Sequence, residues 1–364
     1  MESLKTYALD YIEIYTPMAK ALAYWHTQAL GFKILGYMSS ETNNPGISSY
    51  VLVSNHVTLV LTGTYPPFKT EYNEVSSFIA ENHCGVKRIA LRVLSVKDAF
   101  NRSIENGAIP IKFPSTLEDD LGLIEEASIK LYDNSEITFI NRQGYSGIFK
   151  PGYKAYRNHK FEDESSLVSV DHIAAEVRIN ENTYWANYLS NVIGTKLVQN
   201  IPKGPENTSG MILNVVQAEN STLTLVIAEP DGFGKQSKVQ QNIDSFGPGI
   251  HHLAFTTNDL IATAITFDRN FVDFVSFPPS YYDLLRSNAD FKDINIDELQ
   301  RLNILCDKEG ETYLFQKFIK PIGDRPFFLY EIVQRINGYN GFALKNINIL
   351  KKAEEIEIMN ATSI

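Results

Sequence analysis

The sequence predicts an α+β protein built from four similar modules, each with the element order β-α-β-β-β. The first observation behind this is an internal repeat, because three stretches of the N-terminal half recur in the same order in the C-terminal half. Internal similarity of this kind indicates duplicated structural units. The second observation is that strand-like runs and stretches of helical spacing alternate within the copies. The length of 364 residues also exceeds one ordinary domain.

The first recurring stretch begins each half. Residues 10–14 (DYIEI) resemble residues 171–175 (DHIAA), and a Tyr-Trp pair and then a glycine follow each of them. In the first copy we predict a strand in residues 11–15. A helix should follow in residues 18–30, because Pro17 suits the first turn and the glycine suits the end. Two strand-like runs, residues 48–53 and 57–62, complete the module.

Two further correspondences continue the repeat. Residues 85–91 (GVKRIAL) resemble residues 249–255 (GIHHLAF). Helical spacing follows each of them, over residues 96–106 and 259–270. The last correspondence joins residues 137–145 to residues 330–339.

The repeats divide the chain into modules and domains. The modules cover roughly residues 7–75, 84–148, 168–230 and 248–340. A polar stretch with few aliphatic residues separates the halves and is typical of a linker. We therefore predict an N-terminal domain over residues 1–150, a linker over residues 151–167 and a C-terminal domain over residues 168–364, which includes a helix over residues 345–359.

The composition excludes several kinds of partner and site. The formal net charge is −10, and an acidic protein is a poor match for nucleic acid, whose phosphates require clustered Lys and Arg. Cys84 and Cys306 can form neither a disulfide framework nor a CxxC zinc site. The N-terminus lacks the features of a signal peptide, and no apolar run is long enough to span a membrane. We expect a cytoplasmic protein without a membrane or nucleic-acid partner, in which His, Asp or Glu would bind any metal.

The matched positions of the repeat differ in their chemistry. In the C-terminal half they carry two imidazoles and one carboxylate, which is the ligand set of the 2-His-1-carboxylate facial triad of Fe(II). In the N-terminal half they carry a tyrosine, a threonine and an arginine, and arginine has no lone pair to offer a metal. We therefore predict a metal site in the C-terminal half alone. Its residues are His172, His252 and Glu331, and their counterparts are Tyr11, Arg88 and Thr138.

Each of these residues also has a simpler interpretation. A single histidine in a strand is often a hydrogen-bonded core residue, and a single glutamate often lies on a solvated face or in an ion pair. Against this, the apolar run around Glu331 makes an unpaired carboxylate costly to bury. Adjacent strand residues point to opposite faces, so that only one of His251 and His252 can face a metal. The repeat selects His252.

Several motifs of the chain match the sequence pattern of one known protein family. The C-terminal signature is the most specific, with FQKFIKPIGDRP at residues 315–326 and YEIVQR at residues 330–335. The motifs VDH and GIHHLA match the two histidine motifs of the family, and PPSYY at residues 278–282 also matches. The N-terminal YIEIY and ALGF fit the family's first domain. Through these motifs the chain resembles the 4-hydroxyphenylpyruvate dioxygenase family of the vicinal oxygen chelate superfamily, and the resemblance extends over nearly the whole chain.

The resemblance implies a fold, a cofactor and a reaction. In this family paired modules form two open barrels, and a C-terminal lid helix covers the pocket. The resemblance implies that His172, His252 and Glu331 bind Fe(II), without a separate acid or base residue. It also implies that the 2-oxo acid group of the substrate chelates the iron, that O₂ is the second substrate, and that CO₂ is released. A homodimer or homotetramer is the usual assembly of the family.

The resemblance also implies which residues contact the substrate. Gln316 and Phe318 match pocket positions, and Phe318 could stack on an aromatic ring. Phe342 and Asn346 match the start of the lid helix. Taken without the resemblance, Phe318 and Phe342 are core residues, Gln316 is a surface amide of a strand, and Asn346 is a helix-end residue.

Other pocket positions depart from the family pattern. His251 stands where most members have Gln, Ala228 replaces an Asn, and Lys238 replaces a Gln. Ile347 and Lys351 stand where the lid helix usually carries Phe. A pocket that binds a buried hydroxyl depends on such polar groups for its selectivity. The departures therefore indicate a changed substrate or a different solution for the same one.

Three hypotheses follow. The first is an Fe(II)-dependent dioxygenase that converts 4-hydroxyphenylpyruvate to homogentisate in tyrosine breakdown. The second keeps the iron chemistry but forms 4-hydroxymandelate, or oxidises another aryl or aliphatic 2-oxo acid, and Ile347 and the lost amides favour it. The third is a binding protein of the same fold without catalysis, which has no need for two histidines and a glutamate at matched positions.

Overall fold

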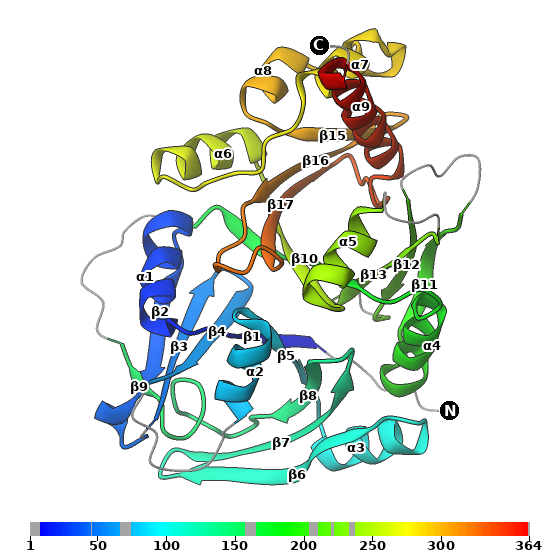
Figure 1. The fold of residues 1–364 in the computed structure, drawn as a ribbon. Helices are drawn as coiled ribbons and strands as arrows, with labels where there is room; N and C mark the ends of the chain where they lie inside the picture. Colours follow the sequence, from blue (N-terminus) through cyan, green and yellow to red (C-terminus); the bar gives the residue numbers. More distant parts are fainter. Residues whose placement is uncertain are drawn as a thin grey trace.

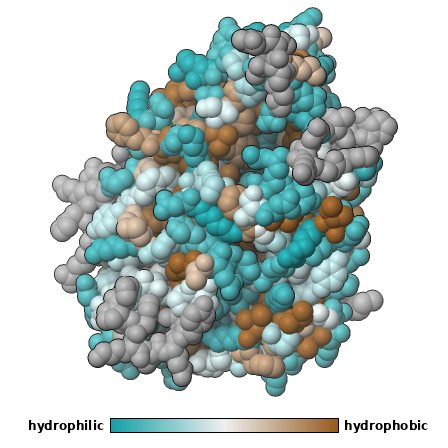
Figure 2. Space-filling model, viewed as in Figure 1, coloured by the Kyte–Doolittle hydropathy of each residue, from teal (hydrophilic) through white to brown (hydrophobic). Residues whose placement is uncertain are grey.

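The computed structural model describes residues 8–44, 46–65, 74–156, 165–203, 210–219, 222–232 and 237–362. Two mixed β-sheets, one from each half of the chain, form the framework, and helices pack around them (Figure 1). This architecture confirms the predicted α+β class. Within these ranges no helix combines the length and the apolar character needed to cross a bilayer. The face shown in Figure 2 is mainly hydrophilic, with separate hydrophobic patches.

The N-terminal sheet has the strand order β6-β7-β8-β5-β1-β4-β3-β2-β9. Its strands are β1 (Ala8–Tyr15), β2 (Lys33–Met38), β3 (Ile47–Ser54), β4 (Val57–Thr64), β5 (Gly85–Arg92), β6 (Pro110–Asp119), β7 (Gly122–Leu131), β8 (Ser135–Asn141) and β9 (Lys154–Ala155). The helices of this half are α1 (Ala19–Leu30), η1 (Ser40–Thr42), α2 (Glu74–Asn82) and α3 (Val96–Glu105).

The C-terminal sheet has the strand order β11-β12-β13-β10-β14-β17-β16-β15. Its strands are β10 (Leu167–Glu176), β11 (Lys196–Ile201), β12 (Met211–Gln217), β13 (Thr224–Pro230), β14 (Gly249–Thr257), β15 (Leu305–Glu309), β16 (Thr312–Ile319) and β17 (Leu329–Ile336). The helices of this half are α4 (Asn182–Ile193), α5 (Lys238–Phe246), α6 (Leu260–Arg269), α7 (Pro279–Ser287), η2 (Ala289–Phe291), α8 (Ile296–Arg301) and α9 (Leu344–Thr362).

The two sheets repeat the same topology. β10 pairs in parallel with β13 and antiparallel with β14, just as β1 pairs with β4 and β5. β14 then pairs in parallel with β17, as β5 does with β8. The irregularities recur too, because a bulge interrupts β1 at Asp10 and β10 at the matched residue Asp171. The internal repeat of the sequence is therefore a repeat of strand order and register.

Local sequence signals fix the ends of the helices. α1 and α4 are each followed by a glycine in the left-handed region, Gly31 with φ 75° and Gly194 with φ 72°, which a residue with a Cβ adopts only at a cost. α3 and α6 follow Ser95 and Asp259, whose side chains each accept a hydrogen bond from the backbone N–H three residues later. The helices predicted over residues 18–30, 96–106, 259–270 and 345–359 form as α1, α3, α6 and α9.

The predicted linker is only partly described. Within it, β9 pairs with β2 at the edge of the N-terminal sheet, so that part of the polar stretch belongs to this sheet. Residues 157–164 lie outside the described part of the chain. The domain boundaries at residues 150 and 168 stay a prediction.

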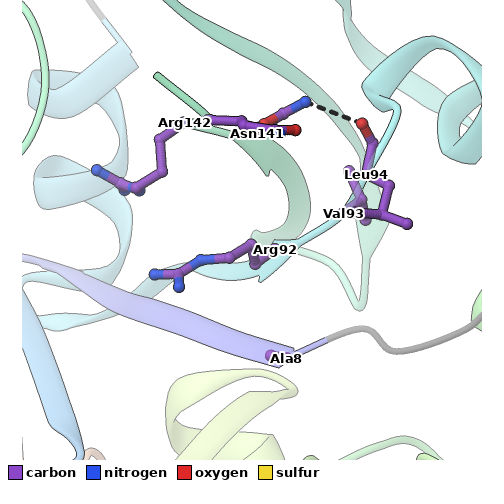
Figure 3. A pocket seen from close by; sticks show the side chains of 7 residues that line it. Ala8, Arg92, Val93, Leu94, Asn141 and Arg142 are labelled. Atoms are coloured by element: carbon purple, nitrogen blue, oxygen red, sulfur yellow. Dashed lines mark hydrogen bonds between the residues drawn. The ribbon is translucent and has the colours of Figure 1, made fainter. Parts of the chain in front are cut away.

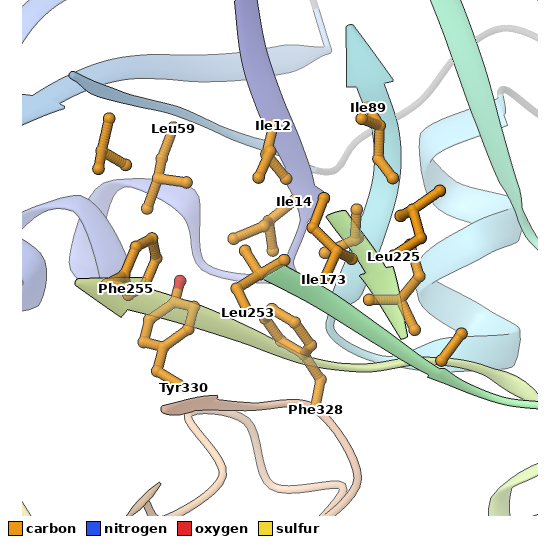
Figure 4. Packing of buried hydrophobic residues seen from close by; sticks show 14 of the residues in the cluster. Ile12, Ile14, Leu59, Ile89, Ile173, Leu225, Leu253, Phe255, Phe328 and Tyr330 are labelled. Carbon is orange, nitrogen blue, oxygen red and sulfur yellow. The ribbon is translucent and has the colours of Figure 1, made fainter. Parts of the chain in front are cut away.

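A single apolar core joins the two halves. In Figure 4, Ile12, Ile14 and Leu59 of the N-terminal sheet face Ile173 and Leu253 of the C-terminal sheet, and all five are buried. Because strand residues alternate between faces, the face of β10 opposite to Ile173 carries His172 and Ala174. One face of the C-terminal sheet thus packs against the N-terminal half, and the other face remains for a site.

Tyr330, the residue before Glu331, takes part in a buried hydrogen bond that crosses this core. His26 of α1 lies with Nδ1 2.7 Å from the carbonyl oxygen of Leu22 and with Nε2 2.8 Å from the Tyr330 hydroxyl. Burial lowers the pKa of His26 to about 4, so the ring is neutral at pH 7. Nδ1 therefore donates to the carbonyl, and Nε2 accepts from Tyr330.

Tyr330→Phe should lower the free energy of unfolding by about 1–3 kcal/mol, because it leaves Nε2 of His26 buried without a donor. Tyr132→Phe is a matched control, since the Tyr132 hydroxyl is buried without a hydrogen-bond partner among the described residues. Its removal should cost nothing. Urea denaturation measures both, and equal effects of the two variants would contradict a role for the His26 contact.

Candidate metal centre

Three neighbouring strands at the middle of the C-terminal sheet bring the predicted ligand residues together. His172 comes from β10, His252 from β14 and Glu331 from β17. One potential ligand atom from each lies within 4.8 Å of the others. Oε2 of Glu331 is 3.3 Å from Nε2 of each histidine. Two imidazole nitrogens and a carboxylate oxygen thus converge on one point, which is the donor set and arrangement of a facial triad.

The strand register explains this convergence. His172 is paired with Ala254, and Ala254 is paired with Glu331, so that these three residues form a row across the strands. His252 lies two residues from Ala254 and therefore points to the same face. About eighty residues separate successive candidates in the chain, yet the duplicated topology places them side by side.

His251 does not point to the opposite face, contrary to the prediction from strand alternation. Ala174 pairs with His252 while the next residue, Ala175, pairs with Ile250, which leaves His251 as the extra residue of a β-bulge. Its Nδ1 lies 2.8 Å from Nδ1 of His252. The expectation was wrong because the rule of alternating faces holds only for a regular strand.

Asp171 and Arg335 hold the ring of His172, and the sequence reasoning assigned no role to either. Nδ1 of His172 donates to Oδ1 of Asp171 at 2.7 Å. Arg335 donates to both oxygens of this carboxylate, from Nε at 2.7 Å and Nη2 at 2.8 Å. Such a partner fixes the tautomer, so that Nε2 of His172 is left to face Glu331. The internal repeat could have indicated this pair, because the matching residues of the N-terminal half, Asp10 and Arg142, also form an ion pair.

The donor set without a metal is a network of opposite charges. Burial disfavours the charged form of His172, but the hydrogen bonds that its ring donates to Asp171 and Glu331, together with the charges of these carboxylates, outweigh burial and raise its pKa to about 9. Burial also opposes the charge of Glu331, yet the two histidines lower its pKa to about 2. Burial lowers the pKa of His252. At neutral pH these directions give a positively charged His172 ring, a neutral His252 ring and an ionised Glu331.

Amide side chains hold the second oxygen of Glu331. Nε2 of Gln316 donates to Oε1 of Glu331 at 2.7 Å, and Nδ2 of Asn346 donates to Oε1 of Gln316 at 3.3 Å. The hydroxyl of Tyr281 donates to Oδ1 of Asn346. The helix α9 is thereby connected through two amides to the carboxylate. Gln316 and Asn346, both predicted from the resemblance, lie beside the candidate centre.

Aromatic and aliphatic side chains flank the histidines. The ring of Phe318 lies 5.9 Å from that of His252 and is nearly perpendicular to it. The ring of Phe342 lies 5.6 Å from that of His172, also edge to face. Ile347 of α9 packs against the buried residues of the same face. These three predicted positions therefore form apolar surroundings for the donor atoms.

The two remaining predicted residues lie farther along the same face. Ala228 of β13 is buried and is paired in parallel with Glu176 of β10. Lys238, the first residue of α5, is exposed, and its charge acts on both Glu176 and His251. Neither residue belongs to the group of converging donor atoms.

The matched face of the N-terminal half is filled with ion pairs. Arg88 forms ion pairs with Glu13 at 2.8 Å, with Glu74 at 2.7 Å, and with Glu136. Lys150 donates to the hydroxyl of Tyr11 at 2.8 Å. A fixed guanidinium occupies the position of a metal ligand, so this half has the repeat without the donor set.

A pocket of about 400 Å³ lies elsewhere on the N-terminal half, and Figure 3 shows the side chains that line it. Arg92 and Arg142 point the same way along it and share the carboxylate of Asp10. None of the predicted site residues lines it. Its lining residues are Ala8, Arg92, Val93, Leu94, Asn141, Arg142 and Gln143.

Known proteins resemble the chain over almost its entire length, although no protein-family model matches it. A 4-hydroxyphenylpyruvate dioxygenase from Tetrahymena thermophila is 30% identical over 365 residues, which cover 96% of this chain and 89% of the relative. One from Coccidioides posadasii (strain C735) is 28% identical over 368 residues, 96% of this chain and 92% of the relative. The solved structure of a triple mutant of 4-hydroxymandelate synthase from Streptomyces coelicolor superimposes with a TM-score of 0.82 at 24% identity, over 96% of this chain and 98% of that one.

Proposed function

The chain belongs to the 4-hydroxyphenylpyruvate dioxygenase family, and from this premise we propose that it is an Fe(II)-dependent dioxygenase that converts 4-hydroxyphenylpyruvate to homogentisate. The reaction consumes one O₂ and releases one CO₂ for each molecule of 2-oxo acid. The observation that supports the proposal is the convergence of His172, His252 and Glu331 within 4.8 Å. We further expect a homo-oligomer in the cytoplasm.

The residues present suit ferrous iron as the bound group. His172, His252 and Glu331 would hold the ion and leave positions open for the 2-oxo acid group and O₂. Iron rather than zinc is expected, because the activation of O₂ requires electrons that zinc does not supply. Asp171 would keep Nε2 of His172 directed at the ion, and Gln316 would hold the second oxygen of Glu331.

The apolar side chains would position the aromatic part of the substrate. Phe318 of β16 lies against His252, and Phe342, in the segment before α9, lies against His172. A ring held by them would lie within reach of the iron and away from bulk water. Gln316 donates to Glu331, and Asn346 donates to Gln316, so we assign both amides to positioning rather than to proton transfer.

Oxygen uptake and product chromatography test the proposal together. Protein reconstituted anaerobically with Fe(II) should consume O₂ when 4-hydroxyphenylpyruvate is added, and homogentisate should accumulate in equal amount. A lack of uptake with every 2-oxo acid of a panel would contradict an enzymatic function and favour a binding protein.

Formation of 4-hydroxymandelate is the second candidate. Ile347 packs on the site face, where the family usually carries a larger aromatic residue, and Ala228 offers no hydrogen bond. A less constrained ring favours attack at the benzylic carbon or a different 2-oxo acid. The same chromatogram separates these outcomes, since 4-hydroxymandelate and homogentisate are isomers with different retention.

Metal affinity should depend on pH. The pKa of His172, raised to about 9, means that the metal-free protein binds a proton there below pH 9, and a metal must displace it. Apparent affinity should rise about tenfold per pH unit between pH 6 and pH 8 and level off near pH 9. Calorimetric titration with Co(II) in two buffers of different protonation enthalpy should show release of about one proton per site. A pH-independent affinity would contradict this.

A further inference from the structure

Glu176 is a buried carboxyl group on the same face as the candidate metal centre. It lies four residues after His172 on β10, so both side chains point to that face. Its Oε1 accepts a hydrogen bond from Nδ2 of Asn242 on α5 at 3.0 Å. Its Oε2 is buried without a hydrogen-bond partner among the described residues. The whole residue is 7% exposed.

The surroundings of this carboxyl group are mostly apolar. The residues beside it on the face are Ala174 on the same strand and Ala228 on β13. Nε2 of His251 lies 3.9 Å from Oε1. The face is covered by apolar side chains of α5 and of the C-terminal segment, namely Val239, Ile243, Phe342, Leu344 and Ile347.

A buried polar atom without a partner costs free energy, commonly about 1–3 kcal/mol. Folded proteins therefore satisfy nearly all such atoms, and each exception calls for an explanation, such as a catalytic role or a bound water or ion. The neighbouring alanines cannot supply a partner for Oε2, and Asn242 already serves Oε1. A bound molecule with a polar oxygen would complete the site.

The position along β10 defines which part of a bound molecule reaches Glu176. Four residues of strand span about 13 Å, a distance of the same order as the length of an extended aryl 2-oxo acid. A molecule whose 2-oxo acid group lies at His172 would thus direct its far end toward Glu176. Phe342, beside His172, and the alanines form the apolar surface between the two ends.

We propose that Oε2 of Glu176 hydrogen bonds to a hydroxyl group at the far end of the 2-oxo acid, and so selects hydroxylated aryl 2-oxo acids over unsubstituted ones. This inference rests on the proposed function. It assigns to Glu176 the polar contact that Ala228 does not provide.

The protonation state suits such a contact. Burial raises the pKa of Glu176 to about 8, against the opposing effects of Asn242 and Lys238. The carboxyl group is therefore neutral at pH 7, and Oε2–H can donate to the hydroxyl oxygen. Glutamine has the same shape and can also donate from this position, whereas leucine cannot.

The test compares two substrates in three proteins. Wild type, Glu176→Gln and Glu176→Leu are assayed at pH 7 with 4-hydroxyphenylpyruvate and phenylpyruvate, which differ by one hydroxyl group. Wild type should prefer the hydroxylated acid at least about tenfold in kcat/KM. Glu176→Leu should lose this preference by lowering kcat/KM for the hydroxylated acid alone, and Glu176→Gln should keep it within about threefold. Anaerobic binding of both acids to the Co(II)-loaded proteins, measured by equilibrium dialysis, should show the same pattern in Kd.

The outcomes separate the two proposals. Equal losses for both acids in Glu176→Leu would show a structural role and overturn the inference. So would a wild type that binds both acids equally, a result that does not depend on the folding of any variant. If the wild type neither binds nor consumes any 2-oxo acid, the proposed function itself fails.

Discussion

Replacing Glu331 with alanine should lower the affinity for Fe(II) by more than about 100-fold, which exceeds the effect of changing an outer partner of a metal ligand. The carboxylate is the one negatively charged member of the three converging donors. Its removal also leaves His172 and His252 without the oxygen that lies 3.3 Å from both. Oxygen uptake with any 2-oxo acid should fall with the metal. Anaerobic Fe(II) titration followed by an oxygen electrode measures both quantities.

Thr138→Ala is the matched control for this variant. Thr138 is the counterpart of Glu331 in the N-terminal half, and it is likewise buried and paired with the alanine of the neighbouring strand. Its hydroxyl lies 2.8 Å from that of Ser128, so the change should affect stability and leave Fe(II) affinity within about twofold of wild type. Iron binding by Glu331→Ala with wild-type affinity would exclude this residue as a ligand.

Asp171→Asn should weaken Fe(II) binding by about 10- to 100-fold, because the partner of a ligating histidine controls its tautomer and basicity. The carboxylate of Asp171 accepts from Nδ1 of His172 at 2.7 Å and also receives two hydrogen bonds from Arg335. An asparagine offers one acceptor oxygen, so one of these contacts would meet an N–H group instead. Fe(II) titration of the variant gives the change in Kd.

The duplicated aspartate separates a metal effect from a folding effect. Asp10→Asn disturbs the same kind of bond, because Asp10 binds Arg142 and Arg92 at the matched bulge. It should lower the free energy of unfolding but leave Fe(II) affinity unchanged. If both variants weaken Fe(II) binding equally, Asp171 acts through stability alone and the positioning role is wrong.

Most of the fold could be predicted because each repeat contains its own local signals. Pro17 and Gly31 bracket the first helix, and the paired stretches of the two halves identify the strands. The repeat also identified His172, His252 and Glu331 as one matched set. The sequence contained no local signal for the edge strand β9, because its two residues, Lys154 and Ala155, form a strand only through pairing with β2.

The rest of the site depends on geometry that spacing does not encode. His251 turns toward His252 because of a bulge, and the period of two in a regular strand predicts the opposite. Glu176 became a candidate for substrate binding only because the structure buries it beside Ala228 and leaves one carboxyl oxygen without a hydrogen-bond partner among the described residues. A pattern of residue types cannot show which atoms of a buried side chain lack a partner.

The shared core of the two halves has a consequence for how the N-terminal half can evolve. Ile12, Ile14 and Leu59 cover the back of the strands that carry the candidate ligands. Substitutions on this buried face should be restricted, even though the matched positions of the N-terminal half carry no metal-donor set. The opposite face of this sheet carries Arg88 and its acidic partners. Its residues can be substituted together, provided that the buried charges stay balanced. The two faces of the N-terminal sheet would thus accept mutations at different rates. The N-terminal half is retained because its apolar face packs against the sheet that carries the candidate ligands.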